Sequence, residues 1–211
     1  MGLYTKNGLY NGYDKHNKER EALDYYATPT NEVENILENA NIDLNNKIIL
    51  EPCAGGGHMV KGIENYCQKH NYIPKKFIKT DIANRGCADC LTGKEYDFFS
   101  DNYPINQADI IIMNPPYSVL EPFLIRAIEI AQQKLIVLCR MQVLEGTGRY
   151  DNIFKENPPT EIYQYIERIQ CWKNGEKPTG SGSQAYCWLI WDKTIEKQEP
   201  PKLYWLHRSE E

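Results

Sequence analysis

The fold of this chain follows from one stretch, Asp109-Ile110-Ile111-Ile112-Met113-Asn114-Pro115-Pro116-Tyr117. Its first part is an isoleucine-rich run that begins at an aspartate, and such a run is typical of a buried parallel strand. Two prolines follow, and they end the strand in a rigid turn because proline fixes φ and lacks an N–H. We therefore predict a buried strand over residues 108–113 that leads into a turn with a defined shape.

Helices and strands alternate on both sides of this stretch. The apolar patterns predict helices over residues 30–40, 58–70 and 121–132, and parallel strands over residues 47–50, 77–80 and 134–138. Residues 161–169 and 185–191 are predicted to form an antiparallel hairpin across the Gly/Ser/Pro-rich loop 173–184. The sequence thus predicts an α/β fold with a doubly wound, mostly parallel sheet and an antiparallel C-terminal hairpin. We expect a flexible N-terminal arm over residues 1–22 and a single domain over residues 23–211.

Composition excludes several classes of protein. The chain has 211 residues, 41% of them hydrophobic, and no apolar run of the roughly 18 residues that a membrane-spanning helix needs. Its seven cysteines are odd in number and scattered, which favours the reducing cytoplasm over a disulfide framework. Cys87 and Cys90 have the spacing of half a zinc site, but no second pair matches it, so we predict no metal. We expect a monomer or a weak dimer.

The turn after the predicted strand carries chemistry as well as shape. Asn114 offers a side-chain amide, Pro115 a backbone carbonyl and Tyr117 an aromatic ring. This set suits the holding of a planar amino or amide nitrogen while a group is transferred to it. Asn-Pro-Pro-Tyr at a strand end resembles the catalytic motif of S-adenosylmethionine-dependent amino-methyltransferases, above all those that methylate adenine N6 in DNA. The resemblance implies a Rossmann-like class I methyltransferase fold.

A glycine-rich turn follows the first predicted strand, in Glu51-Pro52-Cys53-Ala54-Gly55-Gly56-Gly57. Glycines let the backbone approach a ligand closely, and the N-terminus of the next helix offers free N–H groups. Such a turn also serves other nucleotides and flavins, or is a simple tight turn. The Glu51-Pro52 pair resembles the first motif of the methyltransferase family. By that resemblance Ala54, Gly55 and Gly57 wrap the methionine part of S-adenosylmethionine, and Glu51 lies near its amino group through water.

Two further acidic residues have counterparts in the family. Asp81 ends the second predicted strand, where a carboxylate can accept both ribose hydroxyls; a solvated aspartate at a strand end is the alternative. The resemblance implies that Asp97 accepts a hydrogen bond from the adenine amine of the cofactor and that Phe98 packs against its ring. Without the resemblance, Asp97 would be taken as an ordinary loop residue.

The segment Tyr25-Tyr26-Ala27-Thr28-Pro29 precedes the first predicted helix. Family members of the DNA-adenine type carry a Tyr-x-Thr-Pro element at this place. By resemblance, Tyr26, Thr28 and Pro29 close over the methionine carboxylate of the cofactor. The motifs run from residue 25 to residue 117 in the order that the family has, and together they are far more specific than any one of them.

The resemblance also assigns the catalytic residues. The Asn114 amide oxygen and the Pro115 carbonyl accept hydrogen bonds from the target amine, Pro116 keeps the turn rigid, and Tyr117 stacks on a base that has left the helix. Arg140, Arg149 and Lys173 are candidate contacts to the substrate. A solvated face is the alternative interpretation for each of these basic residues.

The expected partner is DNA, although the net charge of −5 is unfavourable for binding phosphates. Only 16 residues separate Asp97 from Asn114, and little chain follows Trp205, so we expect no separate recognition domain. Residues 144–160 and 173–184 would then contact the substrate. RNA bases or a protein glutamine are alternative substrates of an amino-methyltransferase, and an inactive cofactor-binding protein is a further alternative.

Overall fold

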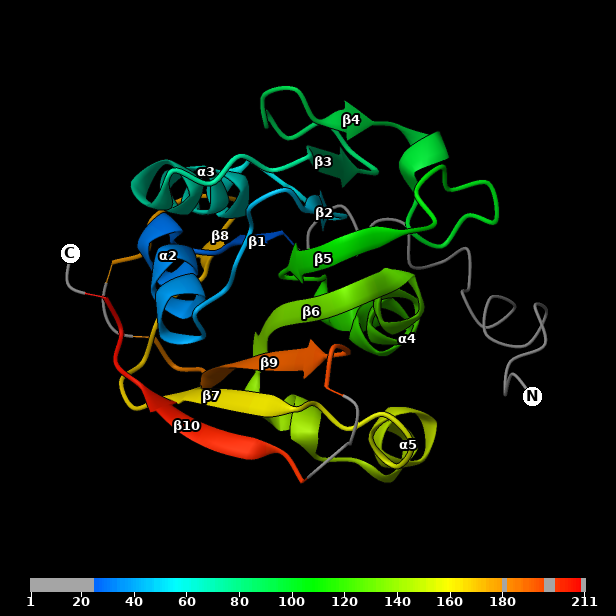
Figure 1. Ribbon diagram of the computed structural model, residues 1–211. Helices are drawn as coiled ribbons and strands as arrows, with labels where there is room; N and C mark the ends of the chain where they lie inside the picture. The colour runs from blue at the N-terminus through cyan, green and yellow to red at the C-terminus, as the bar shows by residue number, and fades with distance from the viewer. Residues whose placement is uncertain (1–24, 180–181, 196–199, 210–211) are drawn as a thin grey trace.

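A computed structural model describes residues 25–179, 182–195 and 200–209, and Figure 1 shows its arrangement. The predicted N-terminal arm, residues 1–22, lies outside the described residues, and residues 180–181 of the predicted loop 173–184 do so too. The strands are β1 (Tyr26–Ala27), β2 (Ile48–Glu51), β3 (Lys76–Asp81), β4 (Leu91–Thr92), β5 (Ala108–Met113), β6 (Ala131–Arg140), β7 (Glu161–Tyr165), β8 (Trp172–Lys173), β9 (Tyr186–Asp192) and β10 (Lys202–Leu206). The α-helices are α2 (Thr30–Asn39), α3 (His58–His70), α4 (Leu120–Ile130) and the short α5 (Thr147–Arg149).

The main sheet has eight strands in the order β10-β7-β9-β6-β5-β2-β3-β4. Strands β4, β3, β2, β5 and β6 are parallel, whereas β9 is antiparallel to both of its neighbours, β6 and β7. This confirms the predicted α/β class with a mostly parallel sheet. The antiparallel pairing of residues 161–164 with residues 187–190 also confirms the predicted C-terminal hairpin, although β7 ends at Tyr165 rather than at residue 169.

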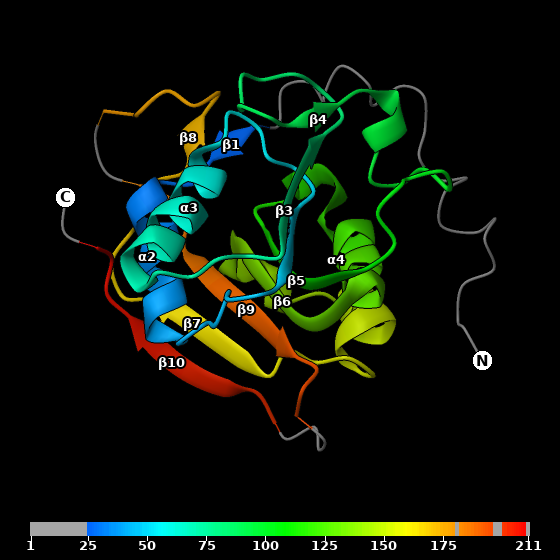
Figure 2. The same cartoon turned by 45° about the horizontal axis from the view of Figure 1, so that its top comes forward.

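Helices cover both faces of the sheet, with α2 and α3 on one side and α4 on the other (Figure 2). Successive residues of β5 explain the two layers, because side chains of a strand alternate between its faces. Ile110 and Ile112 pack into the core with α2 and α3, and Ile111 and Met113 pack into the core with α4. A strand that is buried on both faces must be apolar at every position, which is the pattern that the sequence shows.

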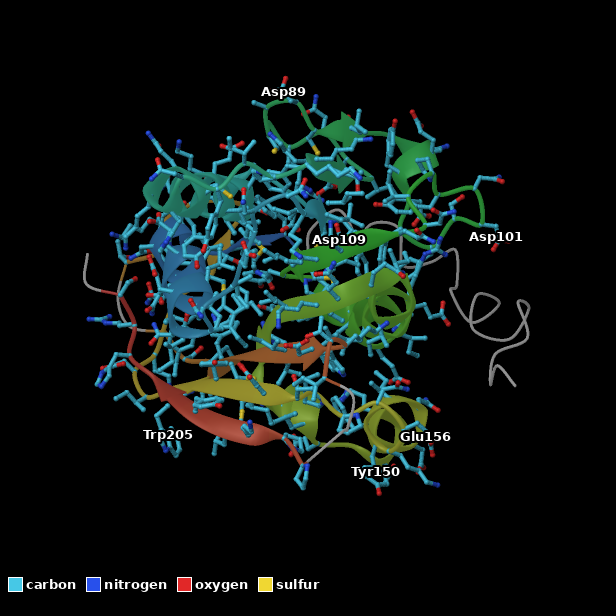
Figure 3. All side chains as sticks on the ribbon, in the orientation of Figure 1. Asp89, Asp101, Asp109, Tyr150, Glu156 and Trp205 are labelled. Carbon is cyan, nitrogen blue, oxygen red and sulfur yellow. The ribbon has the colours of Figure 1, made fainter. Side chains whose placement is uncertain are left out.

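Asp109 breaks this apolar run for a structural reason. One carboxylate oxygen accepts the N–H of Ile48 at 2.8 Å, and the other accepts the side-chain amide of Gln133 at 3.0 Å. The side chain, labelled in Figure 3, therefore joins the beginning of β5 to its neighbours β2 and β6 through these two hydrogen bonds. It sits at the opposite end of β5 from Asn114.

The boundary between α4 and β6 differs from the predicted one. We expected a helix to residue 132 and a strand over residues 134–138, but α4 ends at Ile130 and β6 begins at Ala131. Ala131 is extended, with ψ 126°, and it pairs with Ala108 of β5. The periodic pattern placed Ala131 on the buried helical stripe, and pairing with the neighbouring strand overrode it.

Four strands were not predicted at all: β1, β8, β10 and the two-residue β4, which pairs parallel with β3 at one edge of the main sheet. β1 pairs antiparallel with β8 in a separate two-stranded sheet, and β10 pairs parallel with β7 at the other edge of the main sheet. On β10, Leu203 and Trp205 are more than half exposed, and Trp205 projects outward in Figure 3. Within the described residues, no helix is both long enough and apolar enough to cross a membrane.

Candidate functional site

A cavity lies at the carboxyl ends of β2, β3 and β5. Residues 25–28, which include β1, also line it. In an open α/β sheet the carboxyl ends of the strands are where ligands bind. Ten of the predicted site residues line this cavity: Tyr26, Thr28, Glu51, Pro52, Ala54, Asp81, Asp97, Phe98, Asn114 and Pro116. The structure therefore brings together motifs that are as far apart in the sequence as residues 26 and 116. Pro29, Gly55, Gly57, Pro115, Tyr117, Arg140, Arg149 and Lys173 do not line it.

The glycine turn between β2 and α3 needs its glycines. Gly55 and Gly57 have φ of +54° and +85°, a region that L side chains rarely adopt. A Cβ at Gly55 would lie 2.3 Å from the ring of Tyr25, so a side chain at this position would also displace that ring. The hydroxyl of Tyr25 accepts the N–H of Gly56 at 2.8 Å. The turn is thus shaped for close contact and is covered by an aromatic ring.

Asp81 is fixed against this turn. One carboxylate oxygen accepts the N–H of Gly55 at 2.8 Å, and the other accepts the N–H of Ala83 at 2.9 Å. Burial raises the pKa of Asp81, and these two hydrogen bonds oppose the rise. Asp81 is only 6% exposed, so the alternative of a solvated aspartate at the strand end is wrong.

Glu51 is the most perturbed acid that lines the cavity. It is 1% exposed, and Oε1 accepts hydrogen bonds from both the N–H and the thiol of Cys53 at 3.3 Å. Oε2 is buried and has no hydrogen-bond partner. Burial, reinforced by the nearby Asp81, raises the pKa of Glu51 to about 8 despite the Cys53 bonds. The carboxyl group is therefore prepared to accept a cationic donor, which would stabilise its ionised form.

Three phenylalanines, Phe98, Phe99 and Phe123, form an aromatic part of the cavity lining. Phe98 is 3% exposed and stacks on Phe123 at 4.7 Å between ring centroids. Asp97 accepts the N–H of Phe99 at 3.0 Å, which holds its carboxylate at the cavity edge. A carboxylate can accept a hydrogen bond from an amino group, and aromatic rings can pack against a planar ring. This part of the cavity therefore suits a planar heterocycle that carries an amino group.

Asn114 has a defined amide orientation. Its Nδ2 donates to the carbonyl oxygen of Tyr26 at 2.8 Å and to the hydroxyl of Thr28 at 3.1 Å. A carbonyl can only accept, so the NH₂ side of the amide must face β1. The other side, Oδ1, is buried without a hydrogen-bond partner, and Asn114 is one of the residues that line the cavity. Such an orphaned acceptor is costly, and in native proteins it calls for an explanation.

Tyr117 lies in an aromatic and cationic cluster next to Asn114. Its ring centroid is 5.8 Å from that of Tyr26 and 6.4 Å from that of Tyr186, and the guanidinium of Arg140 lies 4.4 Å from it. Burial raises the pKa of Tyr117 well above its usual range. The predicted substrate residues Tyr117 and Arg140 are therefore neighbours, and Tyr117 belongs to the same turn as Asn114.

The remaining predicted substrate residues lie elsewhere. Arg149 donates to the carbonyl oxygens of Gln142, Val143 and Glu145, so its guanidinium stabilises the loop that leads into α5. Lys173 lies on β8, where it pairs with Tyr26 of β1. Lys173 is thus carried on a strand that borders the site, whereas Arg149 has a structural role in its own loop.

Several cavity residues were not singled out from the sequence. They are Tyr25, Ala27, Cys53, His58, Met59, Ile82, Arg85, Tyr96, Phe99, Val119 and Phe123. Ile82 and Arg85 directly follow the Asp81 strand end, and His58 follows the glycine turn, so proximity in sequence to a motif was a usable signal for these three. Nothing in the sequence distinguished Phe123 from the other apolar residues of its helix.

Cys53 lines the cavity, and its surroundings bear on whether it binds a metal or acts as a nucleophile. Among the described residues, no three His, Cys, Asp or Glu side chains gather as metal ligands would. Burial, with Glu51 and Asp81 nearby, raises the pKa of Cys53 well above its usual range. A thiol that stays protonated is a poor nucleophile, which favours a packing role for Cys53.

Comparison with known proteins gives a likeness in structure but not in sequence. No family model matches the sequence, and no curated protein matches it by sequence. A type I restriction-modification system methyltransferase subunit from Streptococcus thermophilus superposes with a TM-score of 0.60 at 13% identity, over 86% of this chain and 47% of that one. A presumed class I S-adenosylmethionine-dependent methyltransferase from Listeria monocytogenes gives 0.61 at 13% identity, over 87% and 67%.

A third likeness comes from a presumed RNA methyltransferase of Pyrococcus horikoshii, with a TM-score of 0.57 at 17% identity, over 82% of this chain and 88% of that one. At these identities the comparisons show the fold, which is the Rossmann-like fold of class I methyltransferases. The chain spans about half the length of the Streptococcus structure.

Proposed function

We propose that this protein is an S-adenosylmethionine-dependent methyltransferase that methylates the exocyclic N6 amine of adenine in DNA. The proposal joins the fold, the motif resemblance and the cavity geometry. It is carried by one observation above the others: the Asn114 amide uses both N–H groups on protein acceptors and leaves Oδ1 buried without a partner.

The cavity fits the proposed cofactor. Glu51 Oε2 is a buried acceptor without a partner, suited to a ligand ammonium group, and Pro52 and Ala54 of the same turn line the cavity. Asp81 would accept from ribose hydroxyls, while Asp97 and Phe98 would hold the adenine ring. Bound in this way, S-adenosylmethionine supplies a methyl group on a positively charged sulfur.

The substrate amine would be held by Asn114 and Pro115. The lone pair of an exocyclic adenine amine is delocalised into the ring, so the amine is a weak nucleophile. Acceptance of one N–H by Asn114 Oδ1 and of the other by the Pro115 carbonyl would favour a more pyramidal nitrogen, whose lone pair could attack the methyl carbon. The N–C bond would form as the C–S bond breaks, the sulfur would leave as a neutral thioether, and the methylated nitrogen would lose one proton to solvent. Positioning and electrostatics carry such a step, and no covalent intermediate with the protein is needed.

A planar base is favoured over the other amine substrates by the surroundings of Asn114. Tyr117, which ends the Asn-Pro-Pro-Tyr turn, has the rings of Tyr26 and Tyr186 and the guanidinium of Arg140 around its own ring. Aromatic rings and a guanidinium are the groups on which an extruded base stacks. A glutamine side chain offers no ring for this surface. The Tyr-x-Thr-Pro element at residues 26–29 further favours adenine in DNA.

To test this, purified protein is incubated with methyl-labelled S-adenosylmethionine and, in separate reactions, with unmethylated DNA, RNA or cell protein. Nucleosides from digested DNA are then separated by mass. N6-methyladenine in DNA is the expected product. Label confined to RNA or to protein glutamine would replace the DNA assignment, and no label in any pool would refute methyl transfer.

A further inference from the structure

We propose that Thr28 is a positioning residue that acts through Asn114 and not a contact to the carboxylate of the cofactor. The inference rests on the proposed function, because the oxygen that Thr28 positions is the one assigned to the target amine. The Tyr-x-Thr-Pro element thereby belongs to the catalytic turn as much as to the cofactor pocket.

The geometry begins with two acceptors on one short segment. The Tyr26 carbonyl and the Thr28 hydroxyl lie 2.8 Å and 3.1 Å from Asn114 Nδ2. The Tyr26 carbonyl decides which side of the amide is NH₂, because it can only accept. Thr28 takes the second N–H, which fixes the rotation of the amide plane about the Cβ–Cγ bond. With both N–H groups engaged, Oδ1 has one position.

The acceptor pair is itself held from two sides. On one side β1 pairs with β8, with Tyr26 opposite Lys173, and the N–H of Asn174 donates to the Tyr25 carbonyl at 2.9 Å. On the other side Pro29 leads directly into α2, and its carbonyl accepts the N–H of Glu32 at 3.0 Å. Thr28 is 2% exposed between these anchors. Its hydroxyl is therefore placed by the fold before any ligand binds.

Loss of the Thr28 hydroxyl has a specific consequence. In Thr28→Val one Asn114 N–H remains buried without an acceptor, and the amide can rotate about its remaining bond to Tyr26. The orphaned Oδ1 then samples several positions instead of one. Since the catalytic effect of such a group depends on its placement, turnover should fall while cofactor contacts stay intact.

The experiment compares Thr28→Val, Thr28→Ser and wild type, with Thr160→Val as the matched control. Thr160 donates its hydroxyl to the Ile190 carbonyl at 2.9 Å in the strand region that begins β7, so the control makes the same chemical change away from the cavity. Three quantities are measured: kcat at saturating cofactor and DNA, the Kd for S-adenosylmethionine by calorimetry, and the NMR signals of the Asn114 side-chain NH₂ in the free protein. These signals are assigned by their loss in Asn114→Ala.

We expect Thr28→Val to lower kcat about tenfold, the effect of one lost hydrogen bond. The Kd should stay within about twofold, and the Asn114 NH₂ signals should move. Thr28→Ser should restore all three values, and Thr160→Val should change none of them. A Kd that rises tenfold while kcat and the NH₂ signals stay unchanged would assign Thr28 to the cofactor and overturn the proposal.

The two proposals fail in different ways. If wild type transfers no methyl group to DNA, the proposed substrate is wrong, and the NMR signals still decide the role of Thr28. Unchanged Asn114 NH₂ signals in folded Thr28→Val would overturn the positioning role whatever the substrate.

Discussion

Glu51→Gln tests the electrostatics of the cofactor site. In the free protein, burial raises the pKa of Glu51 to about 8, so the carboxyl group is mostly protonated at pH 6 to 7. Beside the ammonium group of the proposed cofactor, the ionised form is favoured, so binding must release the proton. The substitution keeps the size of the side chain and removes this titration.

The size of the effect follows from the pKa. Glu51 must lose its proton before it can bind the ligand in the ionised form, so the affinity rises with pH below its pKa. With a pKa of about 8 in the free protein, the affinity should rise about ninefold between pH 6 and pH 7. The α-amino group of the cofactor stays mostly protonated between pH 6 and pH 7, since α-amino groups have a pKa of about 7.7–8.0. His58 also lines the cavity, and burial lowers its pKa. Glu51→Gln keeps His58, so the difference between the two proteins isolates Glu51.

The assay is calorimetric titration of S-adenosylmethionine at pH 6 and pH 7, repeated at pH 7 in buffers of different ionisation enthalpy. Wild type should bind about ninefold more tightly at pH 7 than at pH 6 and should release about 0.9 proton per site at pH 7. Glu51→Gln should show neither effect. Proton release that is equal in the two proteins would refute the placement of the ammonium group at Glu51.

The raised pKa of Glu51 also predicts how the stability of the ligand-free protein depends on pH. Its folded pKa of about 8 lies above the ordinary value of 4.5, so the folded state binds more protons than the unfolded state between these limits. Stability therefore falls as pH rises through this window, and Glu51→Gln should raise the free energy of unfolding at pH 7 by up to about 3 kcal/mol. Urea unfolding at pH 5 and pH 7 measures this. A gain that is equal at both pH values would contradict the linkage.

The remaining predictions concern other parts of the site and the core. Asp81→Asn should weaken cofactor binding by about 1–3 kcal/mol, from charge-assisted hydrogen bonds lost to the ribose; unchanged affinity in calorimetry would remove Asp81 from the site. Tyr117→Ala should cost about 1–3 kcal/mol of substrate stacking in kcat/KM, whereas Tyr117→Phe should retain it; equal losses in the two variants would rule out stacking. Gly62→Ala should lower the free energy of unfolding by about 1–3 kcal/mol, because a Cβ there would lie 2.6 Å from a Val33 side-chain atom and 2.7 Å from the Thr30 carbonyl. Gly148→Ala, whose Cβ would meet nothing within 4 Å, is the matched control, and equal urea midpoints would contradict the packing of α2 on α3.

The alternating elements and the glycine turn could be predicted because local signals fix them. Isoleucine runs mark strands that are buried on both faces, and the positive φ of Gly55 and Gly57 needs glycine. Motif order placed Glu51, Asp81 and Asn114 at neighbouring strand ends, and a parallel sheet brings such ends together at one edge.

What could not be predicted depends on contacts between distant residues. β1 and β8 are each two residues long and exist through pairing across about 145 residues of chain, for which a local pattern carries no signal. The orientation of the Asn114 amide arises from that same pairing, because it is Tyr26 and Thr28 that accept its N–H groups. Arg149 was assigned to the substrate from its charge alone, while its carbonyl partners follow from the fold of its own loop.

The orphaned oxygen of Asn114 is the centre of this account, and the rate of methyl transfer by Asn114→Ala tests it most directly. Single-turnover transfer to adenine-containing DNA is measured with saturating S-adenosylmethionine, beside the Kd for the cofactor and the exposed control Asn39→Ala on α2. The account predicts a rate at least about 100-fold lower in Asn114→Ala, with a cofactor Kd within a few-fold of wild type and no change in Asn39→Ala. Transfer by Asn114→Ala within about threefold of the wild-type rate would contradict it, because the group proposed to hold the amine would then be dispensable.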